Sequence, residues 1–137
     1  MALQPKPQSK AFPFFYLIGS LFYRLISLVL IYIAIVYWMG ILGISHEGER
    51  RFDLIALHWQ YATTILCVLL PIAALGLWGG FSWGVAIWLI CAITELVMYQ
   101  ALPHLFGQHP NIVFFHLFCM VVFVSLISIA TFIENKK

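Results

Sequence analysis

Four long apolar stretches follow one another along the chain, and short segments rich in polar residues, glycine or proline separate them. We expect these stretches to be helices at residues 25–43, 56–78, 83–103 and 112–133. Each comes close to the roughly 20 apolar residues that a helix needs to cross a bilayer. The pattern predicts an all-α integral membrane protein, an antiparallel four-transmembrane-helix bundle. It divides the chain into an N-terminal tail with an aromatic interfacial segment (residues 1–24), the four-helix transmembrane domain (residues 25–133) and a C-terminal tail (residues 134–137).

Prolines and glycines predict where the helices break or bend. Pro13 is expected to interrupt the aromatic segment, whose rings suit the headgroup level of a bilayer. Pro71 falls inside the second expected span, where we expect a kink and a neighbouring group that satisfies the freed carbonyl. The turn at residues 79–82 is so short that the second and third spans must be antiparallel neighbours. Pro103 is expected to end the third span, and residues 104–111 to form a loop.

The composition excludes a separate soluble domain. Charged residues make up 9% of the 137 residues and hydrophobic residues 64%, whereas soluble domains carry about 25% charged residues. The chain is therefore expected to contact the lipid bilayer along most of its length. Its net charge of +2 is too small to indicate a nucleic-acid partner.

The positions of lysine and arginine predict the orientation, because these residues are enriched in cytoplasmic segments. More of them fall on the side that would hold both termini than on the opposite side. We therefore expect both termini in the cytoplasm. The first group is Lys6, Lys10, Arg24, Lys136 and Lys137, and the second is Arg50 and Arg51, in the charged loop at residues 44–54.

Glu95 is an acid inside the third expected span. An ionisable side chain there costs about 3 kcal/mol on insertion scales, so it usually faces the bundle interior or a water-filled cavity. Trp88 and Tyr99 lie on the same helical face, and the Tyr99 hydroxyl is within reach of the carboxyl. No basic side chain except His116 shares this depth, so we expect Glu95 to be uncharged at neutral pH. Residues of the other spans expected at a similar depth are Thr63, Thr64, His116, Cys119 and Tyr37.

Two interpretations of Glu95 stay open. It is either a neutral acid that hydrogen-bonds across helices as structural glue, or a site that binds a proton, a cation or a polar ligand. Arg24 lies ~25 Å away along the bundle and cannot pair with it directly. The predicted intramembrane polar site is Glu95, Tyr99, Trp88, His116, Thr63 and Thr64.

The histidines gather in the half of the molecule that holds the charged loop. Histidine is the commonest metal ligand in proteins, but these spacings match no compact zinc motif. A haem between two helices would need histidines at mid-membrane, and the candidates fall near helix ends. We therefore expect no cofactor, and keep as weak metal candidates His58, His104, His109 and His116. The three cysteines, all within apolar stretches, are expected to be reduced.

No nucleophile and base share a depth in the predicted bundle, so we do not expect an enzyme. The first functional hypothesis is an accessory or structural membrane subunit that acts by helix–helix contacts within a homo-oligomer or a larger assembly. The alternative is a small oligomeric proton- or cation-coupled transporter that uses Glu95. A weaker alternative is a quinone- or lipid-binding pocket formed by Trp88, Glu95 and Tyr99.

Three segments also carry a resemblance to a known family: residues 23–43, residues 51–99 and Leu105–Gly107. The most distinctive part is the run WG…W…E…MY, which contains Glu95. The chain resembles a group of small four-span membrane proteins of unknown function from alphaproteobacteria, chiefly relatives of rhizobia. This resemblance implies a location in the bacterial inner membrane and implies no activity.

Overall fold

The computed structural model describes residues 11–44 and 52–136, with side chains of the first helix described from Phe14 onward. The predicted bundle is confirmed, because four helical segments are long and apolar enough to cross a membrane. The elements are α1 (Ala11–Ile41), α2 (Leu57–Trp78), α3 (Ser82–Leu96), the π-helical η2 (Val97–Ala101), α4 (Pro103–Phe106) and α5 (Pro110–Asn135).

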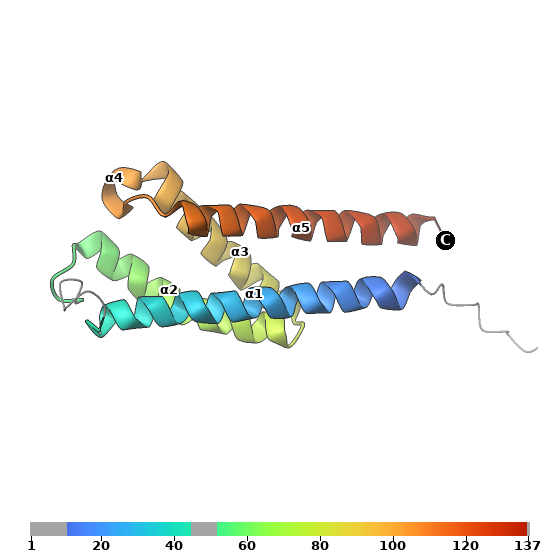
Figure 1. Cartoon of the computed structure of the whole chain (residues 1–137), viewed down its shortest axis with the longest axis horizontal. Coiled ribbons are helices and arrows are strands. Elements are labelled where there is room, and N and C mark those ends of the chain that lie inside the picture. Colours follow the sequence, from blue (N-terminus) through green and yellow to red (C-terminus); the bar gives the residue numbers. More distant parts are fainter. Residues whose placement is uncertain (1–10, 45–51, 137) are drawn as a thin grey trace, which may run out of the picture.

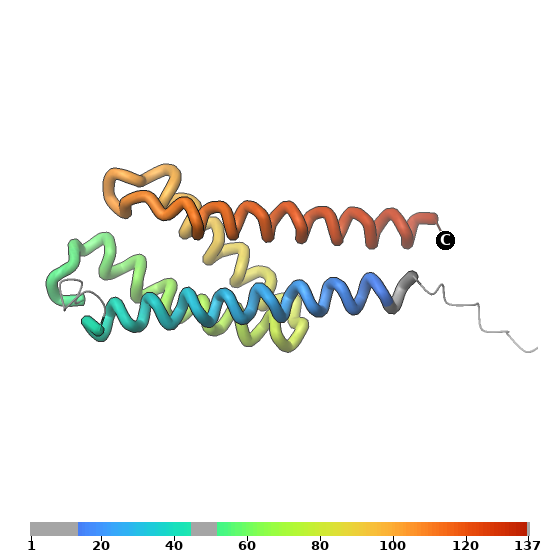
Figure 2. Tube along the Cα trace, viewed as in Figure 1, coloured from blue at the N-terminus to red at the C-terminus, as the bar shows by residue number. Residues whose placement is uncertain are grey.

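The two longest helices, α1 and α5, run the length of the molecule in opposite directions (Figure 1). Helix α2 lies along α1, and α3 crosses from the α2 side toward α5. The start of α1 and the end of α5 lie at one end of the bundle, which we call the terminal end; the opposite end, with α4, is the loop end. The α2–α3 turn stops well short of the terminal end, as the trace in Figure 2 also shows.

Helix α1 differs from the expected span, because it begins at Ala11 and continues without a break through Arg24 to Ile41. The break expected at Pro13 was wrong. A proline in the first turn of a helix is tolerated, since the N–H that it lacks would have no partner there. Most of the charged loop, residues 45–51, lies outside the described residues.

Pro71 lies inside α2 and leaves the carbonyl of Cys67 without its usual donor. The indole Nε1 of Trp38, on α1, donates a hydrogen bond to this carbonyl at 3.1 Å. The expectation that a neighbouring group satisfies the freed carbonyl is therefore confirmed. A second bond joins the same two helices, from the Ser27 hydroxyl to the Ala74 carbonyl.

Glycines bring α2 and α3 into backbone contact beside their turn. A Cβ atom on Gly84 would lie 2.3 Å from the carbonyl carbon of Gly76, so only glycine fits there. Gly80 closes the turn with a φ of 71°, and the Phe81 N–H donates to the Gly76 carbonyl at 2.9 Å. The expected antiparallel pairing of the second and third spans is confirmed.

The third span ends in a wide π-helical turn, in which the Leu102 N–H donates to the Val97 carbonyl at 3.1 Å. Leu102 leaves the helical conformation because the residue before a proline avoids it. The expected loop at residues 104–111 is shorter than predicted. Pro103 begins α4 and Pro110 begins α5, and both occupy the first helical turn, where proline is favoured.

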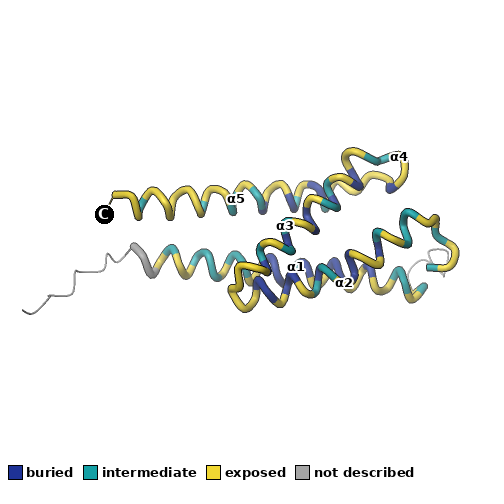
Figure 3. The backbone as a smooth tube through the Cα atoms, turned by 180° about the vertical axis from the view of Figure 1, so that it is seen from behind, coloured by how far each residue is buried: buried dark blue, intermediate teal, exposed yellow. Residues whose placement is uncertain are grey.

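Burial is uneven along the molecule (Figure 3). Dark blue positions concentrate where α1, α2 and α3 meet, whereas the terminal half of α5 is yellow and teal. The buried residues of α5 are Val113, His116 and Cys119, all in its half near the loop end.

Candidate functional site

Glu95 is the centre of a buried hydrogen-bond network. Its side chain is fully buried, with 0% exposure. The Tyr37 hydroxyl donates to Oε1 at 2.8 Å, and Nε2 of His116 lies 2.6 Å from Oε2. Both carboxyl oxygens therefore have partners inside the protein.

Tyr99 joins the network through Tyr37 and not through the acid. The two phenol oxygens lie 3.0 Å apart. The expectation that Tyr99 lies near Glu95 holds, but the hydroxyl reaches the carboxyl by way of a second hydroxyl. We call Tyr37, Glu95, Tyr99 and His116 the polar network. It joins α1, α3, η2 and α5.

Helical spacing and small residues position the acid. Tyr99 follows Glu95 by about one turn, so both face the interior of the bundle. One turn before Glu95, Cys91 and Ala92 are fully buried. Their small side chains let α5 approach closely enough for His116 to reach the carboxyl, as small residues do at other membrane helix contacts.

The Glu95–His116 contact can hold a transferable proton. Either a protonated carboxyl donates to a neutral imidazole, or the imidazole donates to a carboxylate, so the two side chains share one proton at this contact. Within the described residues, Nδ1 of His116 has no hydrogen-bond partner. A buried nitrogen of this kind normally finds a partner, such as an ordered water.

The two threonines of the predicted polar site do not join the network through the hydrogen bonds described. The Thr63 hydroxyl donates to the Trp59 carbonyl, and the Thr64 hydroxyl donates to the Gln60 carbonyl at 2.7 Å. Both bonds lie within α2. Threonine hydroxyls commonly bond the carbonyl one turn earlier in a helix.

Trp88 is fully buried, as expected from its place on the Glu95 face. Its ring meets Phe123 of α5 edge-on, with 5.7 Å between ring centres. In the described part of the chain, its indole N–H has no hydrogen-bond partner. Trp88 therefore packs α3 against α5 and is not joined to the polar network by a hydrogen bond.

The four candidate metal-binding histidines make separate contacts. His58 lies 2.9 Å from the Leu105 carbonyl, and His109 meets the Tyr99 ring edge-on, with 4.9 Å between ring centres. His104 belongs to α4, and His116 to the polar network. Over residues 11–44 and 52–136, no three His, Cys, Asp or Glu side chains gather as a metal ion would require.

A small cavity of about 210 Å³ lies at the loop end, beside the polar network. Tyr99 and His109 both line this cavity, so the cavity reaches one member of the polar network, Tyr99. Glu95 and Trp88 do not line it, and neither do they line the larger cavity described next. The lining residues are Tyr99, Gln100, Pro103, Gln108, His109, Pro110 and Val113.

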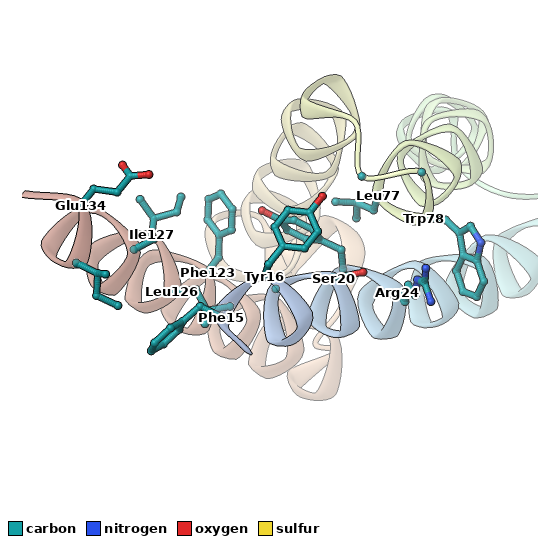
Figure 4. Close-up of a pocket in the computed structure, with 16 residues that line it drawn as sticks. Phe15, Tyr16, Ser20, Arg24, Leu77, Trp78, Phe123, Leu126, Ile127 and Glu134 are labelled. Carbon is teal, nitrogen blue, oxygen red and sulfur yellow. The ribbon is translucent and has the colours of Figure 1, made fainter. Parts of the chain in front are cut away.

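The larger cavity, of about 530 Å³, lies between the terminal halves of α1 and α5 (Figure 4). We call it the terminal cleft. Leu77, Trp78, Gly79 and Gly80 of the α2–α3 turn form its floor. Its walls are Phe15, Tyr16, Gly19, Ser20, Tyr23 and Arg24 of α1, and Phe123, Leu126, Ile127, Ala130, Ile133 and Glu134 of α5.

Nothing in the sequence predicted the terminal cleft, and Tyr37 was named only as a residue at the depth of Glu95. That depth was the signal for Tyr37, because Ser27 and Tyr32 of the same span also carry hydroxyls. Arg24, which has no contact with Glu95, instead lies over the Trp78 ring, 5.7 Å from its centre. Trp78 lies at the end of α2, and Trp38, Trp59 and Trp83 also lie near helix ends.

No curated protein and no solved structure matches this chain. One family of proteins matches residues 17–134, a range that contains all four membrane-length segments almost completely. The match covers most of the chain and includes the polar network and the whole terminal cleft except Phe15 and Tyr16. The chain therefore belongs to the family of unknown function DUF6163.

Proposed function

We propose that this protein is an accessory or structural membrane subunit, which acts by helix–helix contacts within a homo-oligomer or a larger assembly. The observation that carries the proposal is the environment of Glu95. Both of its carboxyl oxygens have hydrogen-bond partners inside the bundle, and its side chain is fully buried. An acid of this kind holds helices together, as interhelical hydrogen bonds do in membranes.

The distribution of burial supports the same proposal. Helix α5 is joined to the other helices mainly in its half near the loop end, where Val113, His116 and Cys119 are buried. Its terminal half faces the cleft. A helix that is fixed at one half and open along the other offers a surface for another subunit.

The proposal is tested by exchanging Glu95 for Gln in the full chain, extracted from its own membrane in mild detergent. Gln keeps hydrogen-bonding groups, so the native mass spectrum should still show a complex larger than one 15.7 kDa chain. Asp53→Asn, which alters an exposed acid outside both the network and the terminal cleft, is the matched control. A wild-type chain that emerges alone would contradict the proposal.

A proton- or cation-coupled transporter is the second candidate, and two observations favour it. Nδ1 of His116 has no partner among the described residues, and the small cavity at the loop end is lined by Tyr99, a member of the network. Proton flux into liposomes separates the candidates. The accessory role predicts no flux that depends on Glu95, whereas the transporter predicts a flux that Glu95→Gln abolishes and Asp53→Asn preserves.

A further inference from the structure

Two helical segments extend alone beyond the packed body of the molecule. Toward the terminal end, Tyr23 meets Phe123, with 6.5 Å between ring centres, and Arg24 lies over the Trp78 ring. Beyond them, α1 continues through residues 11–22 and α5 through residues 124–135. We call these segments the α1 arm and the α5 arm. Each is ~18 Å long at 1.5 Å per residue, and Figure 1 shows both passing the α2–α3 turn.

Both arms expose large apolar side chains. The exposed fraction is 78% for Tyr16 of the α1 arm and 61% for Val124 of the α5 arm. The exposed residues within the arms are Phe14, Tyr16, Leu17 and Leu21 of α1, and Val124, Ile127, Ile129 and Phe132 of α5.

One placement of the bilayer puts its surface at the α2–α3 turn. The arms would then reach ~18 Å into the headgroups and beyond. The headgroup layer is only ~5–8 Å thick on each side, so most of each arm would stand in water. Soluble surfaces do not leave apolar patches of this size uncovered unless a partner covers them.

The other placement puts both arms inside the hydrocarbon. The α2–α3 turn then lies deep in the membrane, with exposed, non-helical backbone at Gly79, Gly80 and Phe81. Arg24 lies at the same level, on Trp78. Non-helical backbone and charged side chains occur at such depth only where protein covers them or water reaches them. The first placement therefore calls for a protein cover, and the second calls for protein or water at the terminal cleft.

A second copy of this chain fits that need. Each copy brings two arms of 12 residues, and two copies bring four, the number that closes a four-helix bundle. Gly19, Ser20 and Ala130 line the cleft and are small enough for helices to approach closely. The α5 arm, which carries Glu134 next to its last residue, ends at the same end of the molecule where the α1 arm begins (Figure 1), and a carboxylate beside a helix N-terminus is favourable.

We propose that the terminal cleft receives the α5 arm of a second copy, so that two chains form a symmetric pair whose four arms pack together. Two-fold pairs of this kind are the commonest oligomers. The proposal rests on the proposed role as a subunit that acts by helix contacts, and it names the partner. The floor of the cleft and the arms are then covered by protein in either placement of the bilayer.

A matched pair of glycine substitutions in α1 tests the proposal. A Cβ atom on Gly19 or on Gly40 would meet nothing within 4 Å, so the single chain has room for a larger side chain at both. Gly19 lines the cleft and Gly40 does not. In native mass spectra of the full chain in mild detergent, we expect a dimer for the wild type and for Gly40→Trp. We expect at least a tenfold loss of dimer for Gly19→Trp.

Disulfide cross-linking in the intact membrane provides the second measurement. The three native cysteines are buried, so the wild-type chain gives the background. Ala130→Cys places a thiol in the cleft, whereas Val121→Cys places one on the same helix outside it. With mild oxidant, Ala130→Cys should give at least a tenfold stronger dimer band than Val121→Cys.

Other outcomes would overturn the proposal in distinguishable ways. A dimer that survives Gly19→Trp would place the contact elsewhere on the protein. A single copy bound through the cleft to a different protein would overturn the pair but leave the accessory role standing. A single copy with only lipid in the cleft, and no cross-link through Ala130→Cys, would overturn both.

Discussion

The two ends of this bundle use different means to hold helices together. Near the loop end, the polar network ties α1, α3, η2 and α5 through fully buried groups, with distances of 2.6–3.0 Å. Near the terminal end, α1 and α5 flank a cleft of about 530 Å³ with mostly apolar walls. Hydrogen bonds give direction and fix partners, whereas apolar walls in a membrane do not choose between protein and lipid. One end is therefore held by directed bonds within a single chain, whereas the other leaves apolar walls exposed.

The largest effect is expected from a substitution in the polar network near the loop end. His116→Ala removes the partner of Oε2 and leaves an acid buried with an unmade bond, which costs about 3 kcal/mol in the free energy of unfolding. Titration with a denaturing detergent measures it. In a Glu95→Gln background the same substitution should cost less, since the two residues are coupled. A loss below about 1 kcal/mol would show that the pair contributes little.

The contact between α2 and α3 beside their turn, near the floor of the terminal cleft, is expected to be almost as sensitive to substitution. Gly84→Ala puts a Cβ atom 2.3 Å from the Gly76 carbonyl carbon, so α2 and α3 must move apart. We expect a loss of about 2 kcal/mol from overpacking. Gly40→Ala is the control, because its Cβ meets open space, and alanine should there be neutral or slightly stabilising. Equal losses at both sites would contradict the close approach of the helices.

A smaller effect tests the bond that compensates for Pro71. Trp38→Phe removes the donor to the Cys67 carbonyl and should cost about 1 kcal/mol. Pro71→Ala supplies a backbone N–H for that carbonyl, so Trp38→Phe should cost measurably less in this background. The double-mutant cycle is read from the same detergent titration. Independence of the two substitutions would show that the indole bond does not serve the proline.

The smallest effect is expected inside the terminal cleft of the single chain. Ile127 is 49% exposed there, so Ile127→Ala should change the free energy of unfolding of the dissociated chain by less than about 0.5 kcal/mol. Val113→Ala, at a buried position of the same helix, should cost about 1–2 kcal/mol. In the associated state, Ile127→Ala should weaken the pair. A large cost in the dissociated chain would show that the cleft wall already packs in one copy.

Much of the candidate site followed from local sequence. Glu95 could be singled out because it is an acidic residue within an apolar stretch. Helical spacing then placed Trp88 and Tyr99 on the same face of that helix. Counting residues from the helix ends put Tyr37 and His116 at its depth, and both contact the acid. The same count included Thr63 and Thr64, which instead bond within α2. Depth can be counted along a helix, but the direction that a side chain faces depends on how the helices rotate against one another.

The sequence by itself determined the number of membrane-length helices, their order and the position of the buried acid, because these depend on how many apolar residues follow one another. It also marked the α2–α3 turn through its glycines. Only the tertiary structure decided that α1 begins at Ala11, that Trp38 serves the Cys67 carbonyl, and that the two arms pass the turn and leave a cleft. These features arise from contacts between helices far apart in the chain. Such contacts are set by packing shape and by hydrogen-bond direction, which hydrophobicity alone does not encode.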